Sequence, residues 1–168
     1  MIKTFIFSAT SGKKEKSLLY TTKTGYMEQH AYTYIKEDNK ESLSKTYNKA
    51  IDFAIKENVD SLVLVHDDVI LENFSEEKLE PLFKKFDVVG CAGATEVKLV
   101  KPALWHLMGG GFNSGNLFGA VAHGDIDEKH MTAFGPYPKR VVLLDGVFLA
   151  IKRKVFKKTA LLNGIFMI

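Results

Sequence analysis

The sequence predicts an α/β fold, a three-layer α/β/α sandwich with a mostly parallel central sheet. Apolar runs rich in β-branched residues occur at Ser61–Val65 and Asp87–Ala92, and such runs are typical of strands that are covered on both faces. Amphipathic helical patterns alternate with these runs, the clearest starting at Ser42. Strands that alternate with helices favour a parallel sheet, because each helix carries the chain back to the edge where the next strand begins.

The first elements follow from local patterns. Ile2–Phe7 is rich in β-branched and aromatic residues and predicts a first strand, which stops at the small polar residues 8–12. Ala31–Lys36 predicts a second strand. Ser42 or Ser44 can cap the helix that follows, whose apolar side chains recur at helical spacing as far as position 58.

The later elements are less regular. Glu76–Lys85 predicts a short amphipathic helix. Residues 93–140 contain many glycines and predict a long irregular excursion, with one short strand around Leu117–Val121. Strand character returns at Val141–Leu144 and Val147–Ile151, on either side of an Asp-Gly pair.

Composition limits the class of protein. The chain has 168 residues, of which 46% are hydrophobic and 26% charged, and this balance predicts one globular domain. The net charge of +3 is too small to favour nucleic-acid binding through bulk electrostatics. A single cysteine excludes an intramolecular disulfide framework, and no apolar run reaches the length of a signal peptide or a membrane span. We therefore expect a cytoplasmic protein.

The strongest candidate for chemistry is the triplet His66, Asp67 and Asp68, directly after the apolar run Ser61–Val65. Ligands of open α/β sheets bind outside the carboxyl ends of the strands. Two adjacent carboxylates are costly to bury unpaired, and Mg²⁺ or Mn²⁺ could neutralise them while binding a diphosphate on its other side. The alternative is that both aspartates begin a solvated turn and cap the next helix.

Other candidates have weaker signals. Asp145 precedes Gly146 between two apolar runs, which suits either a functional carboxylate or a tight β-turn. Asn48 on the long helix and Asn39 after the second strand could contact a base or ribose, or could be ordinary polar residues. Trp105 stands before the Gly-rich segment and suits a lid that stacks on a sugar.

Together these blocks resemble the GT-A fold glycosyltransferases of the family 2 type, in particular their short glycosyltransferase-like subgroup. The resemblance runs through Ser42–Ile51, Val65–Val69, Val89–Gly93, Ala103–Trp105 and Leu144–Arg153. It implies a Rossmann-like nucleotide-diphospho-sugar transferase fold over residues 1–168. Residues 1–92 would be the nucleotide-binding half and residues 93–168 the half for sugar and acceptor.

The resemblance also implies roles for individual residues. The His66–Asp68 segment would stand in the place of the DxD motif, with Asp68 holding the metal bound to the donor diphosphate. Asp67 would lie near the ribose or the metal, and His66 could add a ligand or a hydrogen bond. The resemblance places Ala9, Glu37, Asn39 and Asn48 around the base and ribose, Trp105 in the donor site, and Asp145 beside the transferred sugar or the acceptor.

The sequence departs from the family pattern at the catalytic base. Family members continue, past the region that Val147–Phe156 resembles, into a segment with an acidic base, whereas no carboxylate follows Asp145 here. Sugar transfer by direct displacement requires a base for the proton of the acceptor hydroxyl. The chain has therefore lost its base, uses Asp145 instead, or is truncated within its second half.

The function expected from these observations is metal-dependent transfer of a sugar, with inversion, from a UDP-, GDP- or dTDP-sugar to a glycan or another hydroxyl acceptor. Mn²⁺ or Mg²⁺ is the expected cofactor, and neither nucleic acid nor a membrane span is expected. A catalytically inactive relative that binds a nucleotide sugar or a glycan is one alternative. A nucleotidyltransferase is the other, although residues 11–14 resemble its basic Gly-rich loop only faintly.

Overall fold

The computed structural model describes residues 3–21, 32–72, 74–98, 104–124 and 128–158, and these form two compact units. Among the described residues, the first unit contains those up to Val89 and those from Gly146 to Lys158, and the second contains those within Gly90–Asp145. The prediction of one domain with halves 1–92 and 93–168 stays a prediction.

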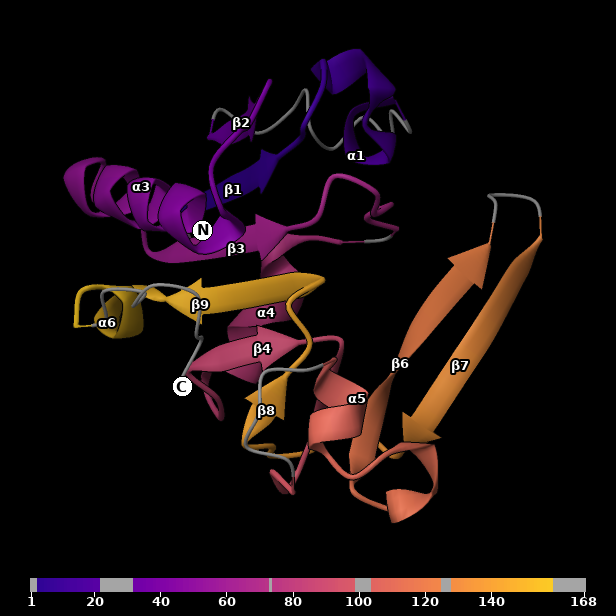
Figure 1. Cartoon of the computed structure of the whole chain (residues 1–168). Helices are drawn as coiled ribbons and strands as arrows, with labels where there is room; N and C mark the ends of the chain where they lie inside the picture. Colours follow the sequence, from indigo (N-terminus) through magenta and orange to yellow (C-terminus); the bar gives the residue numbers. More distant parts are fainter. Residues whose placement is uncertain (1–2, 22–31, 73, 99–103, 125–127, 159–168) are drawn as a thin grey trace. The chain divides into compact units, whose positions relative to one another are not determined.

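The first unit is built on a five-stranded sheet in the order β2-β1-β3-β9-β4. Its strands are β1 (Thr4–Ala9), β2 (Thr33–Lys36), β3 (Ser61–Val65), β4 (Val88–Gly90) and β9 (Phe148–Lys152). β1 pairs in parallel with both β2 and β3, whereas β9 runs antiparallel to β3. Figure 1 shows the arrows of β1 and β3 pointing one way and the arrow of β9 pointing the other.

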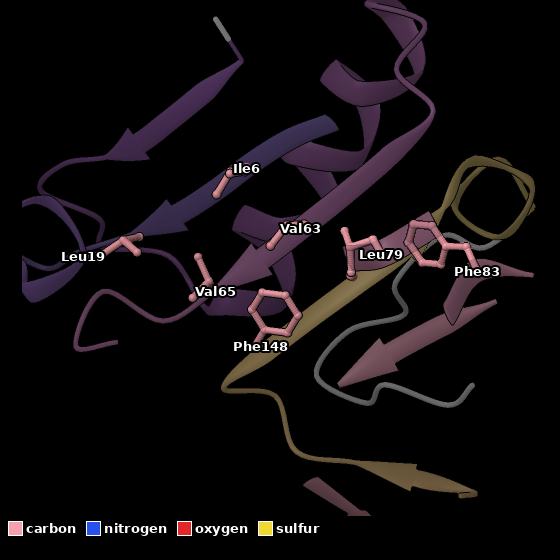
Figure 2. Close-up of a cluster of buried hydrophobic side chains, with 8 residues drawn as sticks. Ile6, Leu19, Val63, Val65, Leu79, Phe83 and Phe148 are labelled. Carbon is pink, nitrogen blue, oxygen red and sulfur yellow. The ribbon is translucent and has the colours of Figure 1, made fainter. Parts of the chain in front are cut away.

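Helices cover this sheet on both faces. The helices of the first unit are α1 (Leu18–Thr21), α3 (Leu43–Lys56), α4 (Glu76–Phe83) and α6 (Arg153–Phe156), with a 3-10 turn η1 (Lys14–Lys16). Phe53 of α3 packs against Phe5 of β1, with ring centroids 4.8 Å apart. Leu79 and Phe83 of α4 belong to the core cluster on the other face, shown in Figure 2 with side chains of β1, β3 and β9. Every residue of β1 and β3 is consequently buried.

The second unit contains a four-stranded antiparallel sheet in the order β7-β6-β5-β8. Its elements are β5 (Ala92–Ala94), α5 (Trp105–Met108), η2 (Phe112–Ser114), β6 (Leu117–Gly124), β7 (Lys129–Gly135) and β8 (Leu143–Leu144). The register between β6 and β7 shifts at Gly119, which has a φ of +100°. A glycine is required there, because a Cβ atom would lie 2.1 Å from the carbonyl oxygen of Cys91.

The predicted three-layer α/β/α sandwich with a mostly parallel sheet, and with it the GT-A or Rossmann-like assignment, is wrong. The strands form two sheets, one mixed and one antiparallel. β9 begins beside the end of β3, where Phe148 pairs with Val65, so it must run back along β3 in the opposite direction.

Several local predictions can be compared with these elements. Ser61–Val65 is confirmed as β3, and α3 is confirmed with Ser42 as its cap, which accepts a hydrogen bond from the amide of Lys45. The single strand predicted at Asp87–Ala92 is wrong, because β4 and β5 belong to different sheets. The short strand predicted around Leu117–Val121 is confirmed as part of β6, whereas the irregular structure predicted for the rest of 93–140 is wrong, since that stretch also contains α5 and β7. Within the described residues, no helix is long and apolar enough to cross a membrane.

Gly119→Ala tests the antiparallel ladder of the second unit. We expect the substitution to lower the free energy of unfolding by more than about 2 kcal/mol, because left-handed backbone strain adds to the overlap with Cys91. Chemical denaturation measures the loss. Gly12→Ala is the matched control, because nothing lies within 4 Å of its added Cβ atom. Equal stabilities of the two variants would contradict this register.

Candidate functional site

The candidate site lies where three parallel strands of the first unit end. Ala9 pairs with Lys36, and Phe7 pairs with Leu64, so β1, β2 and β3 end at the same edge of the sheet. The loops that follow β1 and β2 are joined by backbone hydrogen bonds, including one of 2.9 Å from the Asn39 amide to the Thr10 carbonyl. An ion pair between Lys13 and Asp38 also joins these loops, and it lowers the pKa of Asp38.

The turn His66–Asp68 follows β3 at this edge and is held by its backbone. The His66 amide donates to the Val147 carbonyl at 3.1 Å. The Asp67 carbonyl accepts from the Leu19 amide at 3.1 Å and from the Ser17 hydroxyl at 2.9 Å. The backbone of the turn is therefore tied to the start of α1, with Ser17 just before it, and to the segment before β9, independently of its acidic side chains.

The acidic side chains of this turn differ in exposure. The side chain of Asp68 is 76% exposed, that of His66 is 37% exposed, and Asp67 is half-buried. The Nδ1 atom of His66 lies 3.9 Å from Oδ1 of Asp68, which is too long for a hydrogen bond. Neither aspartate caps the next helix, because the N-cap of α4 is Ser75. That part of the alternative interpretation is wrong.

The donor set suits one kind of metal site. Among the described residues, no group of three or more His, Cys, Asp or Glu side chains could hold a metal ion. A closed, all-protein cage is therefore not present in this part of the chain. Mg²⁺ is commonly held by one or two carboxylates together with substrate phosphates and water, and the adjacent Asp67 and Asp68 fit that pattern.

The residues expected around the base and ribose lie near the same edge, at the ends of β1 and β2 and on α3. Ala9 is the last residue of β1 and is 8% exposed. Glu37 accepts a hydrogen bond from the Lys14 amide at 3.2 Å. Asn39 accepts from the Thr46 hydroxyl at 3.0 Å and donates to the Glu41 carbonyl at 2.9 Å, so it braces the start of α3. Asn48 is half-buried on α3.

Trp105 and Asp145 belong to the second unit. Trp105 begins α5 instead of lying in an irregular lid, and its ring meets Phe134 edge-on with centroids 5.1 Å apart. His106 and Phe134 each stack on Phe112, so Trp105 belongs to a group of four rings. Asp145 is half-buried at the end of the unit, and its amide donates to the Ala92 carbonyl at 2.9 Å. Their predicted functional roles stay predictions.

Sequence reasoning missed two side chains at the edge of the first unit. Ser17 is 2% exposed, and its hydroxyl holds the Asp67 carbonyl. Tyr47 is 3% exposed, and its hydroxyl has no hydrogen-bond partner among the described residues. Tyr47 could have been found from its phenol in an otherwise mostly apolar helical stripe. Ser17 gives no such signal, because its contact with Asp67 spans 50 positions.

Comparisons with known proteins bear on the fold alone. No protein-family model matches the sequence, and no curated protein matches it. Among solved structures, the chain is similar to A197 from STIV, known from a crystal structure, with 18% sequence identity and a TM-score of 0.57. The similarity covers 94% of this chain and 69% of that chain.

Proposed function

We propose that this protein binds the diphosphate of a nucleotide sugar through a divalent cation at the turn His66–Asp68 and transfers the sugar to a hydroxyl acceptor. The observation that supports this proposal is the turn itself. Its backbone is fixed by Val147, Ser17 and Leu19, while the carboxylate of Asp68 extends into solvent. A fixed backbone with an exposed carboxylate suits a residue that receives a cation together with its ligand.

The location supports a phosphate ligand. Ligands of open α/β sheets bind outside the carboxyl ends of their strands, and the turn lies at the shared carboxyl edge of β1, β2 and β3. Lys13, Lys14 and Lys16 follow β1 at this edge and add positive charge. Lys13 is already paired with Asp38, which leaves Lys14 and Lys16 as the better candidates for contact with an anion.

Each residue of the proposed site would have a separate role in binding or catalysis. Asp68 would hold Mn²⁺ or Mg²⁺, with Asp67 and His66 beside it, and the ion would supply charge neutralisation on the departing nucleoside diphosphate. The loop residues Glu37 and Asn39 would border the nucleoside. Direct displacement at a sugar carbon needs the proton of the acceptor hydroxyl removed, and Asp145, in the second unit, is the base that the sequence resemblance implies.

Donor binding is the first test. In a thermal-shift experiment, UDP-, GDP- or dTDP-sugar at about 100 times its Kd should stabilise the protein by about 2.7 kcal/mol. For a chain of this size that is about 5–10 °C. Asp68→Asn should lose most of the Mn²⁺-dependent part of this shift. Asp52→Asn, an exposed aspartate on α3, is the matched control and should keep it. If no nucleotide sugar gives a Mn²⁺-dependent shift, the proposal fails.

Transfer is the second test and separates an enzyme from a binding protein. With the donor that gives the largest shift, sugar release to water or to added glycans should be detectable with Mn²⁺. Asp145→Asn should reduce this turnover by at least about 100-fold while leaving donor affinity within about twofold, as expected for loss of a general base. Donor binding without turnover in the unmodified protein would exclude the enzyme and leave a nucleotide-sugar binding protein.

A further inference from the structure

The hydroxyl of Tyr47 is a buried polar group without a hydrogen-bond partner in the described part of the chain. Tyr47 is 3% exposed and lies on the inner face of α3 with Ala50, Ile51 and Ala54. Buried hydroxyls in native proteins are normally paired, and an unpaired one calls for an explanation. A phenylalanine would pack equally well in this position without the unpaired group.

The direction of the side chain indicates where the hydroxyl lies. α3 follows β2, so its first turn starts at the carboxyl edge of the sheet and the helix runs back toward the start of β3. Helical side chains lean toward the N-terminus of their helix. The Tyr47 ring meets Phe7 of β1 edge-on, with centroids 6.1 Å apart, and Phe7 is level with Leu64 of β3. The ring therefore leans toward the turn that follows β3.

The charges around the hydroxyl agree with this placement. Burial, together with the negative charges of Asp67 and Asp68, raises the pKa of Tyr47 to about 12. The phenol therefore keeps its proton at neutral pH, and donating that proton in a hydrogen bond would stabilise the buried hydroxyl. The two carboxylates are negatively charged acceptors for such a bond. Asp67 is the better candidate, because it is half-buried whereas Asp68 is exposed.

We propose that Tyr47 is a positioning residue, whose hydroxyl donates a hydrogen bond to the carboxylate of Asp67 when a cation and a diphosphate occupy the turn His66–Asp68. This inference rests on the proposed function. A bound diphosphate would remove water from Asp67, and a desolvated carboxylate needs a replacement partner. A hydrogen bond to one oxygen of Asp67 would leave the other oxygen directed at the cation, as partners of ligating carboxylates commonly do.

Tyr47→Phe tests this role, because it removes only the hydroxyl and keeps the ring on Phe7. The probes are Mn²⁺ with whichever of UDP, GDP and dTDP shows the largest Mn²⁺-dependent shift. We expect the Kd for Mn²⁺ in the presence of the nucleotide to rise at least about tenfold. The melting temperature without ligand should stay equal or rise, because an unpaired buried hydroxyl has been removed.

Tyr34→Phe is the matched control. Tyr34 also contacts Phe7, in this case by stacking with centroids 6.0 Å apart, but it is 54% exposed, so its hydroxyl is not confined to the core. This variant should bind Mn²⁺ and the nucleotide as the unmodified protein does.

A double-mutant cycle is a second test of the role of Tyr47. In an Asp67→Asn background, Tyr47→Phe should change the Mn²⁺ affinity less than twofold, because the proposed partner is already altered.

Two outcomes would overturn the inference in distinguishable ways. If the unmodified protein shows Mn²⁺-dependent nucleotide binding and Tyr47→Phe has the same Kd as Tyr34→Phe, the role of Tyr47 is excluded while the proposed function stands. If no nucleotide binds the unmodified protein in a Mn²⁺-dependent way, the proposed function fails and the role of Tyr47 fails with it.

Discussion

The parallel pairing of β1 with both β2 and β3 is the constraint on which the candidate site depends. Parallel strands share one carboxyl edge, so three loops that are distant in sequence are brought together there. The same pairing requires the chain to return over the face of the sheet, and α3 makes that return between β2 and β3. Its first turns therefore lie at this edge, where Asn39 accepts a hydrogen bond from Thr46 and where Tyr47 is close enough to Asp67 and Asp68 to be affected by their charges.

Much of this edge was predictable from sequence because its signals are local. Ser61–Val65 is an unbroken apolar run, and Ser42 caps a helix with one apolar face, so β3 and α3 are recognisable without knowledge of their neighbours. Sheet pairing is not local. The direction of β9 depends on where the chain re-enters the first unit at Gly146, and no pattern within Phe148–Lys152 records this. The secondary structure of the second unit was hard to predict because many of its residues are small or exposed. β7, for example, has no buried residue.

The candidate site, like the fold, was only partly predictable from the sequence. Asp67 and Asp68 could be proposed because they directly follow a buried strand, where carboxylates are unexpected without a partner. Their unequal exposure, and the anchoring of Asp67 by Ser17, follow only from the fold. Tyr47 packs in the core on the buried face of α3. Its unpaired hydroxyl became visible only once the elements around it were placed.

The central claim is that a cation-bound diphosphate binds at the carboxyl edge of β1, β2 and β3. Paramagnetic Mn²⁺ broadens NMR signals steeply with proximity, so amide spectra recorded with a nucleoside diphosphate and Mn²⁺, against Mg²⁺ as the diamagnetic reference, locate the ion directly. We predict the strongest broadening at His66–Val69 and Thr10–Gly12. Within the first unit, the weakest broadening is expected at Asp60, just before β3, and at Arg153, just after β9, because both lie at the edge of the sheet away from the site. Broadening centred on Asp60 and Arg153, or spread evenly over the unit, would contradict the claim.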